Sequence, residues 1–295
     1  MKTGHKIKGF FSGNVGMLNR SRAGNVVMFL FLLIFAIYSA LPIVLVLLQS
    51  IKPLNELFIY PPRFFVVNPT MDNFKQLPSL MAASKVPFAR YIFNSLFVSV
   101  IGTIGHIILA SMCAYVFTKH QFIGRNFMFN MVVLSLMFST AVTGIPSYII
   151  MSGLHLTDTY WALILPAFSS SLGLYLMKQF MSSNVPDAII EAARIDGSGE
   201  FRLFWRIVMP MVKPAWLTLI VFSFQNLWNA SGGIYIQSED IKSLSYAISQ
   251  IVSGGIARAG ASAASIVIMM LLPILVFFFT QSNIVETMSS SGIKE

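Results

Sequence analysis

An apolar run of 23 residues, free of charged side chains, extends from Val26 to Leu48. A helix needs about 20 apolar residues to cross the roughly 30 Å hydrocarbon core of a bilayer, so this run predicts a membrane-spanning helix. It is longer than the about 7–15 residues of a signal-peptide core, which favours a helix that is retained. The alternative is a signal sequence whose cleavage site is not evident.

Five further segments have the same length and apolar character. They are roughly Tyr91–Phe117, Phe127–Met151, Tyr160–Phe180, Met211–Gly232 and Ala263–Val285. None of the six carries Lys, Arg, Asp or Glu in its interior, where an unpaired charge is costly in lipid. Only 11% of the residues are charged, against about a quarter in a soluble domain. We therefore predict an all-α integral membrane protein with six transmembrane helices.

Positive charge is distributed unevenly among the loops. Six spans place both termini on one side, and this side carries 13 of the 20 Lys and Arg residues, against 7 on the other. Because cytoplasmic loops are enriched in Lys and Arg, the bias predicts cytoplasmic termini. It also accounts for the net charge of +9 without a nucleic-acid partner. The exception is loop 49–90, which carries five bases on the outer side, and the rule weakens for long loops.

The chain is predicted to form one membrane domain. Residues 1–25 are a basic cytoplasmic segment, 26–285 the six-helix permease-like domain, and 286–295 a cytoplasmic tail. Two outer loops stand apart, because 52–90 is rich in proline and 232–262 in glycine. Both are expected to be irregular. They either meet a partner outside the membrane or simply connect the spans.

A charged stretch, NVPDAIIEAARIDGSGEFRLFWRIVMP (184–210), interrupts the apolar pattern before the fifth segment. Its first half predicts a short helix. Pro186 suits the first helical position and Asp187 suits the positive N-terminal end. Glu191 and Arg194 have the i,i+3 spacing of a helical ion pair.

Gly197 suits a left-handed cap at the end of this helix. Ser198 then suits the N-cap of a second helix, with Glu200 in its first turn. The stretch thus predicts two amphipathic helices separated by a glycine, on the cytoplasmic side. Such a unit is either a projecting helix that a separate subunit binds or an interfacial helix that lies on lipid.

The same stretch resembles the EAA loop of ABC-importer permeases, E-A-A-x3-G-x9-I-x-L-P. The matching residues are Glu191, Ala192, Ala193, Gly197, Ile207 and Pro210, and Met209 replaces the leucine with an apolar side chain of similar size. Other parts resemble the carbohydrate-uptake branch of that family, typified by the maltose permease MalG: SIKPLNELFIYPPRFFVVNPTMDNF, YIFNSLFVSV, CAYVFTKHQFIGR, GIPSYIIMSGLHLTDTYWALILP and QSNIVETMSSSGIKE. The resemblance covers most of the chain.

This resemblance implies the type I ABC importer fold, with a cytoplasmic coupling helix that docks in a groove of a separate ATPase. The residues assigned to ATPase coupling are Glu191, Ala192, Ala193, Arg194, Asp196 and Gly197. In the family, the acidic position corresponding to Glu191 pairs with a basic ATPase residue, and Gly197 permits the bend. The implied partners are a second, MalF-like permease, a dimer of ABC ATPase subunits and an extracytoplasmic sugar-binding protein, at a bacterial plasma membrane.

No catalytic residue, cofactor or metal is expected in this chain. It lacks a Gly-x4-Gly-Lys-Ser/Thr phosphate loop, so ATP and Mg are expected on the partner ATPase. The single cysteine, Cys113, excludes an internal disulfide or a Cys-based metal site. His106 is alone in its segment and is expected to be a packed or hydrogen-bonded residue rather than a metal ligand.

A sugar path needs amides, hydroxyls and aromatic faces rather than formal charges. The candidate pathway residues are Gln225, Asn226, Trp228, Asn229, Thr140 and Tyr175. Thr140 precedes Gly144 and Pro146, where a kinked or broken helix would expose polar backbone to the path. The alternative for the Gln225–Asn229 group is hydrogen bonding between helices, with a tryptophan in the interface belt.

Together these features predict a permease subunit of an ATP-driven ABC importer, which carries a sugar, with an oligosaccharide favoured, into a bacterial cell by alternating access. One alternative is a permease for another neutral or charged small solute, and another is a free-standing secondary transporter. The lack of intramembrane acids and bases favours a neutral solute and disfavours the secondary transporter, which usually carries an intramembrane ion site. A membrane-embedded enzyme is disfavoured because no reactive group of residues is present.

Overall fold

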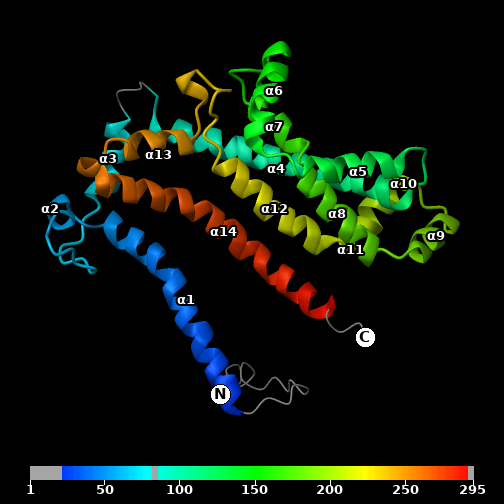
Figure 1. The fold of residues 1–295 in the computed structure, drawn as a ribbon, viewed down its shortest axis with the longest axis horizontal. Helices are drawn as coiled ribbons and strands as arrows, with labels where there is room; N and C mark the ends of the chain where they lie inside the picture. Colours follow the sequence, from blue (N-terminus) through cyan, green and yellow to red (C-terminus); the bar gives the residue numbers. More distant parts are fainter. Residues whose placement is uncertain (1–21, 82–85, 292–295) are drawn as a thin grey trace, which may run out of the picture. The chain divides into compact units, whose positions relative to one another are not determined.

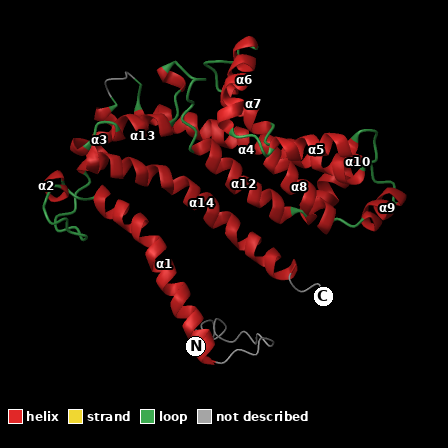
Figure 2. Cartoon of the chain, viewed as in Figure 1, coloured by secondary structure: helices red, strands yellow, loops and turns green. Residues whose placement is uncertain are grey.

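The computed structural model describes residues 22–81 and 86–291 (Figure 1). Within these ranges the secondary structure is helical, with turns and loops between helices and no strand (Figure 2). This agrees with the all-α prediction. Most of the predicted basic segment 1–25 and the last four residues of the predicted tail lie outside the described residues. The chain divides into two compact units, Met1–Val46 and Leu47–Glu295.

Helix α1 (Arg22–Ser50) contains the long apolar run from which the membrane prediction began. Its side chains from Gly24 to Leu45 are all exposed. A helix that is apolar on every face is stable only when other apolar material surrounds it. A bilayer supplies such material around a membrane-spanning helix.

The second unit contains the other helices. They are α2 (Leu54–Leu57), α3 (Asp72–Leu80), α4 (Phe88–Lys119), α5 (Arg125–Ser135), α6 (Thr140–Gly153), α7 (Trp161–Phe168), α8 (Ser171–Asn184), α9 (Asp187–Ile195), α10 (Glu200–Leu203), the π-helix η2 (Phe204–Val208), α11 (Met209–Met211), α12 (Lys213–Trp228), the 3-10 turns η3 (Glu239–Ile241) and η4 (Ile256–Arg258), α13 (Leu244–Val252) and α14 (Ala259–Ser291).

Helix α4 is the centre of this unit. It packs against α12, α8 and α7, and α12 in turn packs against α14. Figure 1 shows α12 lying between α4 and α14. One buried cluster surrounds the C-terminal end of α4 and includes Met177, Leu203 and Val208. Another surrounds its N-terminal end and includes Tyr91 and Trp228.

The apolar segments form helices, but two of them are interrupted. Among the described residues, Gly24–Ser50, Phe88–Lys119 and Ile256–Gln281 are each long and apolar enough to cross a membrane. The pair Glu200–Met211 and Lys213–Trp228, bent by 80°, meets the same test when the two helices are taken together as one broken span. The predicted continuous helix 127–151 is instead α5 and α6, and 160–180 is α7 and α8.

Both breaks lie where a serine with extended backbone precedes the next helix. Helix α7 ends at Phe168, two residues after Pro166, and Ser170, the N-cap of α8, has extended backbone. Between α5 and α6, the backbone of Ser139 is extended at the N-cap of α6. Helix α6 runs through Gly144 and Pro146 without a break, so the broken helix predicted there is wrong and the interruption lies before Thr140.

Buried polar side chains fix loops 49–90 and 232–262, which were predicted to lie on the outer side. Asn94 donates hydrogen bonds of 2.8 and 2.9 Å to the carbonyls of Asp240 and Lys242. Ser95 accepts one of 2.7 Å from the Leu244 N–H. Asn73 on α3 donates to the carbonyls of Ser50 and Lys52. Leu77 of loop 49–90 and Leu244 of loop 232–262 belong to the same buried cluster around the N-terminal end of α4, so both loops lie at that end of the unit.

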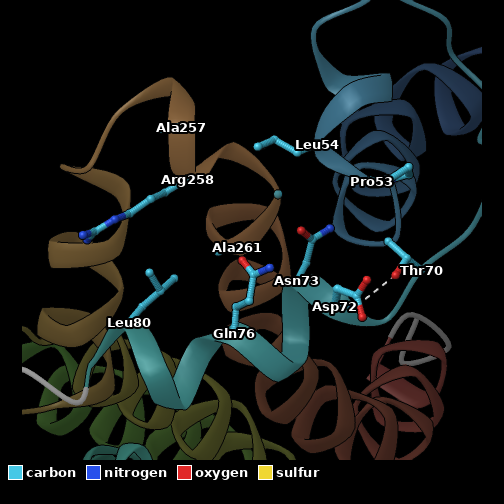
Figure 3. Close-up of a pocket in the computed structure, with 11 residues that line it drawn as sticks. Pro53, Leu54, Thr70, Asp72, Asn73, Gln76, Leu80, Ala257, Arg258 and Ala261 are labelled. Carbon is cyan, nitrogen blue, oxygen red and sulfur yellow. Dashed lines mark hydrogen bonds between the residues drawn. The ribbon is translucent and has the colours of Figure 1, made fainter.

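A cavity of about 250 Å³ lies between these two loops (Figure 3). Thr70, Asp72 and Gln76 line it on one side, and Arg258 and Ala261 line it on the other. Asn73 also borders it, but its amide is already bonded to two carbonyls. We interpret this cavity as a space left where the two loops pack against each other, rather than as a binding site.

Candidate functional site

The charged stretch 184–210 folds as a helix, a glycine turn and a second helical segment. Helix α9 runs from Asp187 to Ile195, and Pro186 is its N-cap, one residue before the predicted position. Gly197 has a φ of +78°. Its N–H donates to the Arg194 carbonyl and the Ser198 N–H donates to the Ala193 carbonyl. These two bonds form a Schellman motif, which confirms the predicted left-handed cap.

The second helix begins one residue later than predicted. Gly199, with extended backbone, is the N-cap of α10, and no side chain caps it. The predicted N-cap Ser198 is wrong, because its N–H is used to close the preceding helix. After α10 the chain forms the π-helix η2, a form often found at functional sites.

Helix α9 has one buried and one exposed face. Ile190 and Ala193 are 2% and 7% exposed and belong to the cluster around the end of α4. Glu191, Ala192 and Asp196 are exposed. Glu191 forms no ion pair with any described residue, so the predicted pairing with Arg194 is wrong. The exposed face is therefore free for contact with another protein.

Arg194 pairs with Glu200 instead, across the glycine turn. Its Nη2 lies 2.9 Å from Oε1 of Glu200, and its Nε donates to the same oxygen at 3.0 Å. The left-handed turn at Gly197 reverses the chain and brings the start of α10 back to the end of α9. The pair therefore links the end of α9 to the start of α10.

Glu200 also joins this unit to α4. The hydroxyl of Tyr115 donates to Oε2 of Glu200 at 2.6 Å, and Nε2 of His120 lies 3.4 Å from the same oxygen. The Tyr115 ring packs against Phe204, with 5.5 Å between centroids. One carboxylate thus contacts α9, α10 and the end of α4.

A second link connects α4 to the start of α9. Nζ of Lys119 lies 2.6 Å from Oδ1 of Asp187 and also donates to the carbonyl of Val185. The Lys119 side chain is 5% exposed, whereas that of Asp187 is 77% exposed. The hydrogen bond from the ammonium group, together with its charge, lowers the pKa of Asp187. The start and the end of α9 are therefore both attached to α4.

The tyrosine, lysine and histidine in these links were not assigned a role from the sequence. Their only signal was position, because Tyr115, Lys119 and His120 cluster at the end of an apolar helix. The end of that helix and the charged stretch 184–210 are both predicted to lie on the cytoplasmic side, so polar groups at the helix end can meet that stretch. Their partners lie more than 60 residues away in the chain, so spacing alone does not identify them.

The predicted solute residues at the end of α12 separate into two groups. Gln225, Asn226 and Asn229 are exposed. The amide of Asn229 donates back to the Gln225 carbonyl at 2.9 Å. Trp228 is fully buried, stacks on Phe224 and donates from Nε1 to the Met269 carbonyl at 2.7 Å. Its ring therefore joins α12 to α14 and presents no free face to a solute.

The remaining two candidates lie elsewhere. Tyr175 is half-buried on α8, where its ring stacks on Phe129 and its hydroxyl accepts from Gln179 at 3.3 Å. Thr140 is the first residue of α6, and its side chain lies outside the described residues. No hydrogen bond or ring contact within the described part of the chain joins Tyr175 to the α12 amides. The described residues also contain no group of three or more His, Cys, Asp or Glu able to hold a metal ion.

Comparisons with known proteins agree with this arrangement. The family model described as "Binding-protein-dependent transport system inner membrane component" matches residues 106–290. Among solved structures, a bacterial ABC transporter involved in the import of the acidic polysaccharide alginate has a chain that superposes with a TM-score of 0.75 at 20% identity, covering 90% of this chain and 99% of that one. This likeness establishes the fold.

Three relatives from Bacillus subtilis (strain 168) are similar in sequence. Protein LplC is 35% identical over 59% of this chain and 55% of its own length. The polygalacturonan/rhamnogalacturonan transport system permease protein YtcP is 30% identical over 71% of each chain. The arabinooligosaccharides transport system permease protein AraQ is 27% identical over 90% of this chain and 94% of its own length. The chain thus spans about half of LplC and nearly all of AraQ.

Proposed function

Because this chain belongs to the family of binding-protein-dependent transport system inner membrane components, we propose that it is the permease subunit of an ATP-driven importer that carries an oligosaccharide into a bacterial cell. The names of AraQ and YtcP and the description of the alginate importer support a saccharide. The membrane-spanning segments lack formal charges in their interiors, which favours a neutral solute.

The observation that carries this proposal is the shape of α9 and its links to α4. Its buried face is packed on this chain, and its exposed face offers Glu191, whose carboxylate has no ion-pair partner among the described residues. This is what a helix docked in a groove of a separate ATPase requires. Arg194 and Glu200 fix the turn behind it.

The links to α4 suggest how force is passed on. When ATP closes a pair of ATPase subunits, α9 moves with the groove that holds it. Lys119–Asp187 and Tyr115–Glu200 then carry that displacement to the end of α4, and α4 packs on α7, α8 and α12. Rigid-body rotation of packed helices is an established route between two states of a transporter. ATP supplies the bias between those states.

The same proposal assigns partners and orientation. A second permease subunit covers the exposed apolar surfaces, two ATPase subunits hold the coupling helices, and an outer binding protein delivers the sugar. ATP and Mg are bound by the ATPase subunits. The charge distribution places both termini in the cytoplasm, so the joined loops 49–90 and 232–262 face the binding protein.

A second candidate solute is a small phosphorylated compound. The sn-glycerol-3-phosphate transport system permease protein UgpE of Yersinia enterocolitica is 35% identical over half of this chain. A phosphate needs basic or strongly donating groups in its path, whereas the interiors of the predicted spans contain no Lys or Arg. We therefore favour the oligosaccharide.

The test is purification of this subunit from membranes in mild detergent, followed by mass spectrometry of the proteins that accompany it. We expect a second permease and an ABC ATPase, and we expect ATP-dependent uptake of a sugar after reconstitution with the binding protein. Recovery of this chain as a homo-oligomer that transports without ATP would instead support a secondary transporter.

A further inference from the structure

A cavity of about 270 Å³ lies where α4, α8 and α12 meet the break between α7 and α8. Four polar side chains line it, from His106, Ser170, Ser223 and Asn226, and no Lys, Arg, Asp or Glu does. The rest of the wall is apolar and includes the ring of Phe222, which is 47% exposed. A mostly apolar wall with a few polar groups is the usual composition of a small-molecule site.

The break between α7 and α8 places irregular backbone at this cavity. Helix α7 ends at Phe168 and α8 begins at Ser171, with Ser170 on the cavity wall. Non-helical backbone at membrane depth is tolerated only where protein buries it or where it lines a water-filled cavity. The first N–H groups of a helix have no partner inside that helix, and no side chain caps α8.

His106 provides an independent indication of a ligand. It lies in the middle part of α4 and is 2% exposed. The backbone carbonyls of Phe168 and Ala167, at the end of α7, accept from its imidazole, whereas its Nδ1 has no hydrogen-bond partner among the described residues. The ring lies against the first turn of α8. A Cβ at Gly173 would come within 2.0 Å of Nε2, so only glycine lets the imidazole lie there. Three other buried side-chain atoms on α4, those of Ser99, Thr103 and Ser111, also lack a partner among the described residues, but of the four only His106 lines the cavity. A ligand or water in the cavity would satisfy its Nδ1.

The polar side chains that α12 contributes to the cavity favour a cavity filled with water over a groove filled with lipid. The amide of Asn226 is exposed, and it makes no hydrogen bond to a described residue. Ser223 lies one turn before it on the same wall. In lipid these groups would remain unsatisfied at a cost in free energy. Water or the hydroxyls of a solute would satisfy them.

We propose that this cavity is a solute subsite within this subunit and that it holds one neutral sugar ring during transport. The proposal rests on the importer function above. Ring hydroxyls exchange hydrogen bonds with His106, Asn226 and the serines, and an apolar ring face packs on Phe222. Its volume is below the roughly 300–1,000 Å³ of pockets that enclose whole drug-sized ligands, so one ring enters at a time. Without a cationic side chain, a uronate or phosphate would lack its usual partner.

Cysteine accessibility tests whether the cavity is open to water. The chain has one cysteine, Cys113, so Cys113→Ala gives a background for Asn226→Cys and Ser223→Cys in the assembled transporter. The control is Leu109→Cys, because Leu109 lies one turn after His106 on α4, is 43% exposed and does not line the cavity. ATPase activity of each variant shows that the complex is assembled.

The reagent is a membrane-impermeant, negatively charged methanethiosulfonate. Because it needs a hydrated thiolate, we expect the two cavity cysteines to react at least about tenfold faster than the Leu109→Cys control. We also expect the rate to change when ATP and vanadate trap the complex in its other state. Equal, slow reaction at all three positions would show that the cavity opens to lipid, and it would overturn the proposal.

Protection by sugar tests the ligand. A panel of neutral arabino-oligosaccharides and acidic oligogalacturonates is first screened for ATP-dependent uptake. The transported sugar is then added during labelling of Asn226→Cys, with Gln225→Cys as the exposed neighbour outside the cavity wall. We expect a neutral sugar to slow labelling several-fold at Asn226→Cys and not at Gln225→Cys.

The outcomes separate the two proposals. Uptake of no sugar contradicts the importer function. Uptake without protection leaves that function intact and overturns the subsite. Protection by an oligogalacturonate alone overturns the assignment of a neutral ring.

Discussion

The hydroxyl of Tyr115 donates a 2.6 Å hydrogen bond to Oε2 of Glu200, while Oε1 of the same carboxylate accepts from Arg194 at 3.0 Å. The two oxygens of one side chain therefore connect the end of α4 to the end of α9. Neither α4 nor α9 can shift far without breaking one of these bonds.

Tyr115→Phe removes one hydroxyl and leaves the ring packed on Phe204. A hydrogen bond to a charged group contributes about 1.5–3 kcal/mol, and the lower end applies because the Glu200 side chain is 50% exposed. We expect the variant to assemble, to keep most of its ATPase activity and to transport less sugar per ATP hydrolysed. Glu200→Gln should show a similar loss. An unchanged ratio of transport to hydrolysis in both variants would remove this link from the coupling mechanism.

Glu191→Lys reverses the charge on the exposed face of α9. If a basic ATPase residue is its partner, like charges then face each other, and we expect transport to fall by at least about tenfold, equivalent to ~1.4 kcal/mol. Insertion into the membrane should be unaffected, because Glu191 contacts no charged residue in the described part of this chain. Glu191→Gln is the matched control and should retain more transport. Comparable activity of the Lys and Gln variants would argue against an ionic contact.

Gly197→Pro tests the turn behind α9. Proline holds φ near −65°, whereas Gly197 adopts +78°, and the substitution also removes the N–H that donates to Arg194. We expect loss of ATPase binding, measured by co-purification. Gly197→Asn should retain binding, because asparagine tolerates the left-handed region. Equal recovery of the ATPase with the Pro and Asn variants would contradict the role of the turn.

The Lys119–Asp187 pair should make stability depend on pH. The pKa of Asp187 is lowered in the folded state by the ammonium group of Lys119. A lowered carboxyl pKa adds stability that is present above the ordinary value, about 3.9, and disappears as the pH falls through the native value. The difference in Tm between the wild type and Asp187→Asn should therefore be constant from about pH 8 to pH 6 and shrink below about pH 4. A difference that stays constant down to pH 3 would contradict this assignment.

Trp228 is expected to behave as a packing residue. Replacing a buried aromatic side chain by alanine costs about 3–5 kcal/mol, so Trp228→Ala should greatly reduce the amount of folded subunit. Trp228→Phe keeps much of the stacking on Phe224 and loses the bond to Met269. We expect it to lower Tm while leaving KM for the sugar unchanged. A raised KM with a normal Tm would show that Trp228 contacts the solute, as the sequence predicted.

Hydropathy predicted the long helices well, because the energy of burying apolar surface in lipid depends on composition more than on detail. The runs starting at Val26, Tyr91 and Ala263 lie within α1, α4 and α14. It did not predict that 127–151 and 160–180 are each divided. Hydropathy is summed over a window of about 20 residues. Two or three residues whose backbone is not helical change that sum very little.

The turn at Gly197 was predictable because left-handed backbone selects one residue type. The partner of Arg194 was not, since Glu191 and Glu200 are both near in sequence and only the direction of the turn decides between them. Trp228 and Asn226 present a similar problem on α12. Both are polar or amphipathic residues near a helix end, and the sequence does not indicate which faces the core.

The Schellman turn and the Arg194–Glu200 pair are complete without any partner protein. Helix α9 is therefore preorganised, and under the proposed function an ATPase that binds it has little backbone entropy to remove. Its affinity would then depend on the few exposed side chains of α9 rather than on the folding of a loop. A change of partner would require new residues on that face and no change to the helix that carries them.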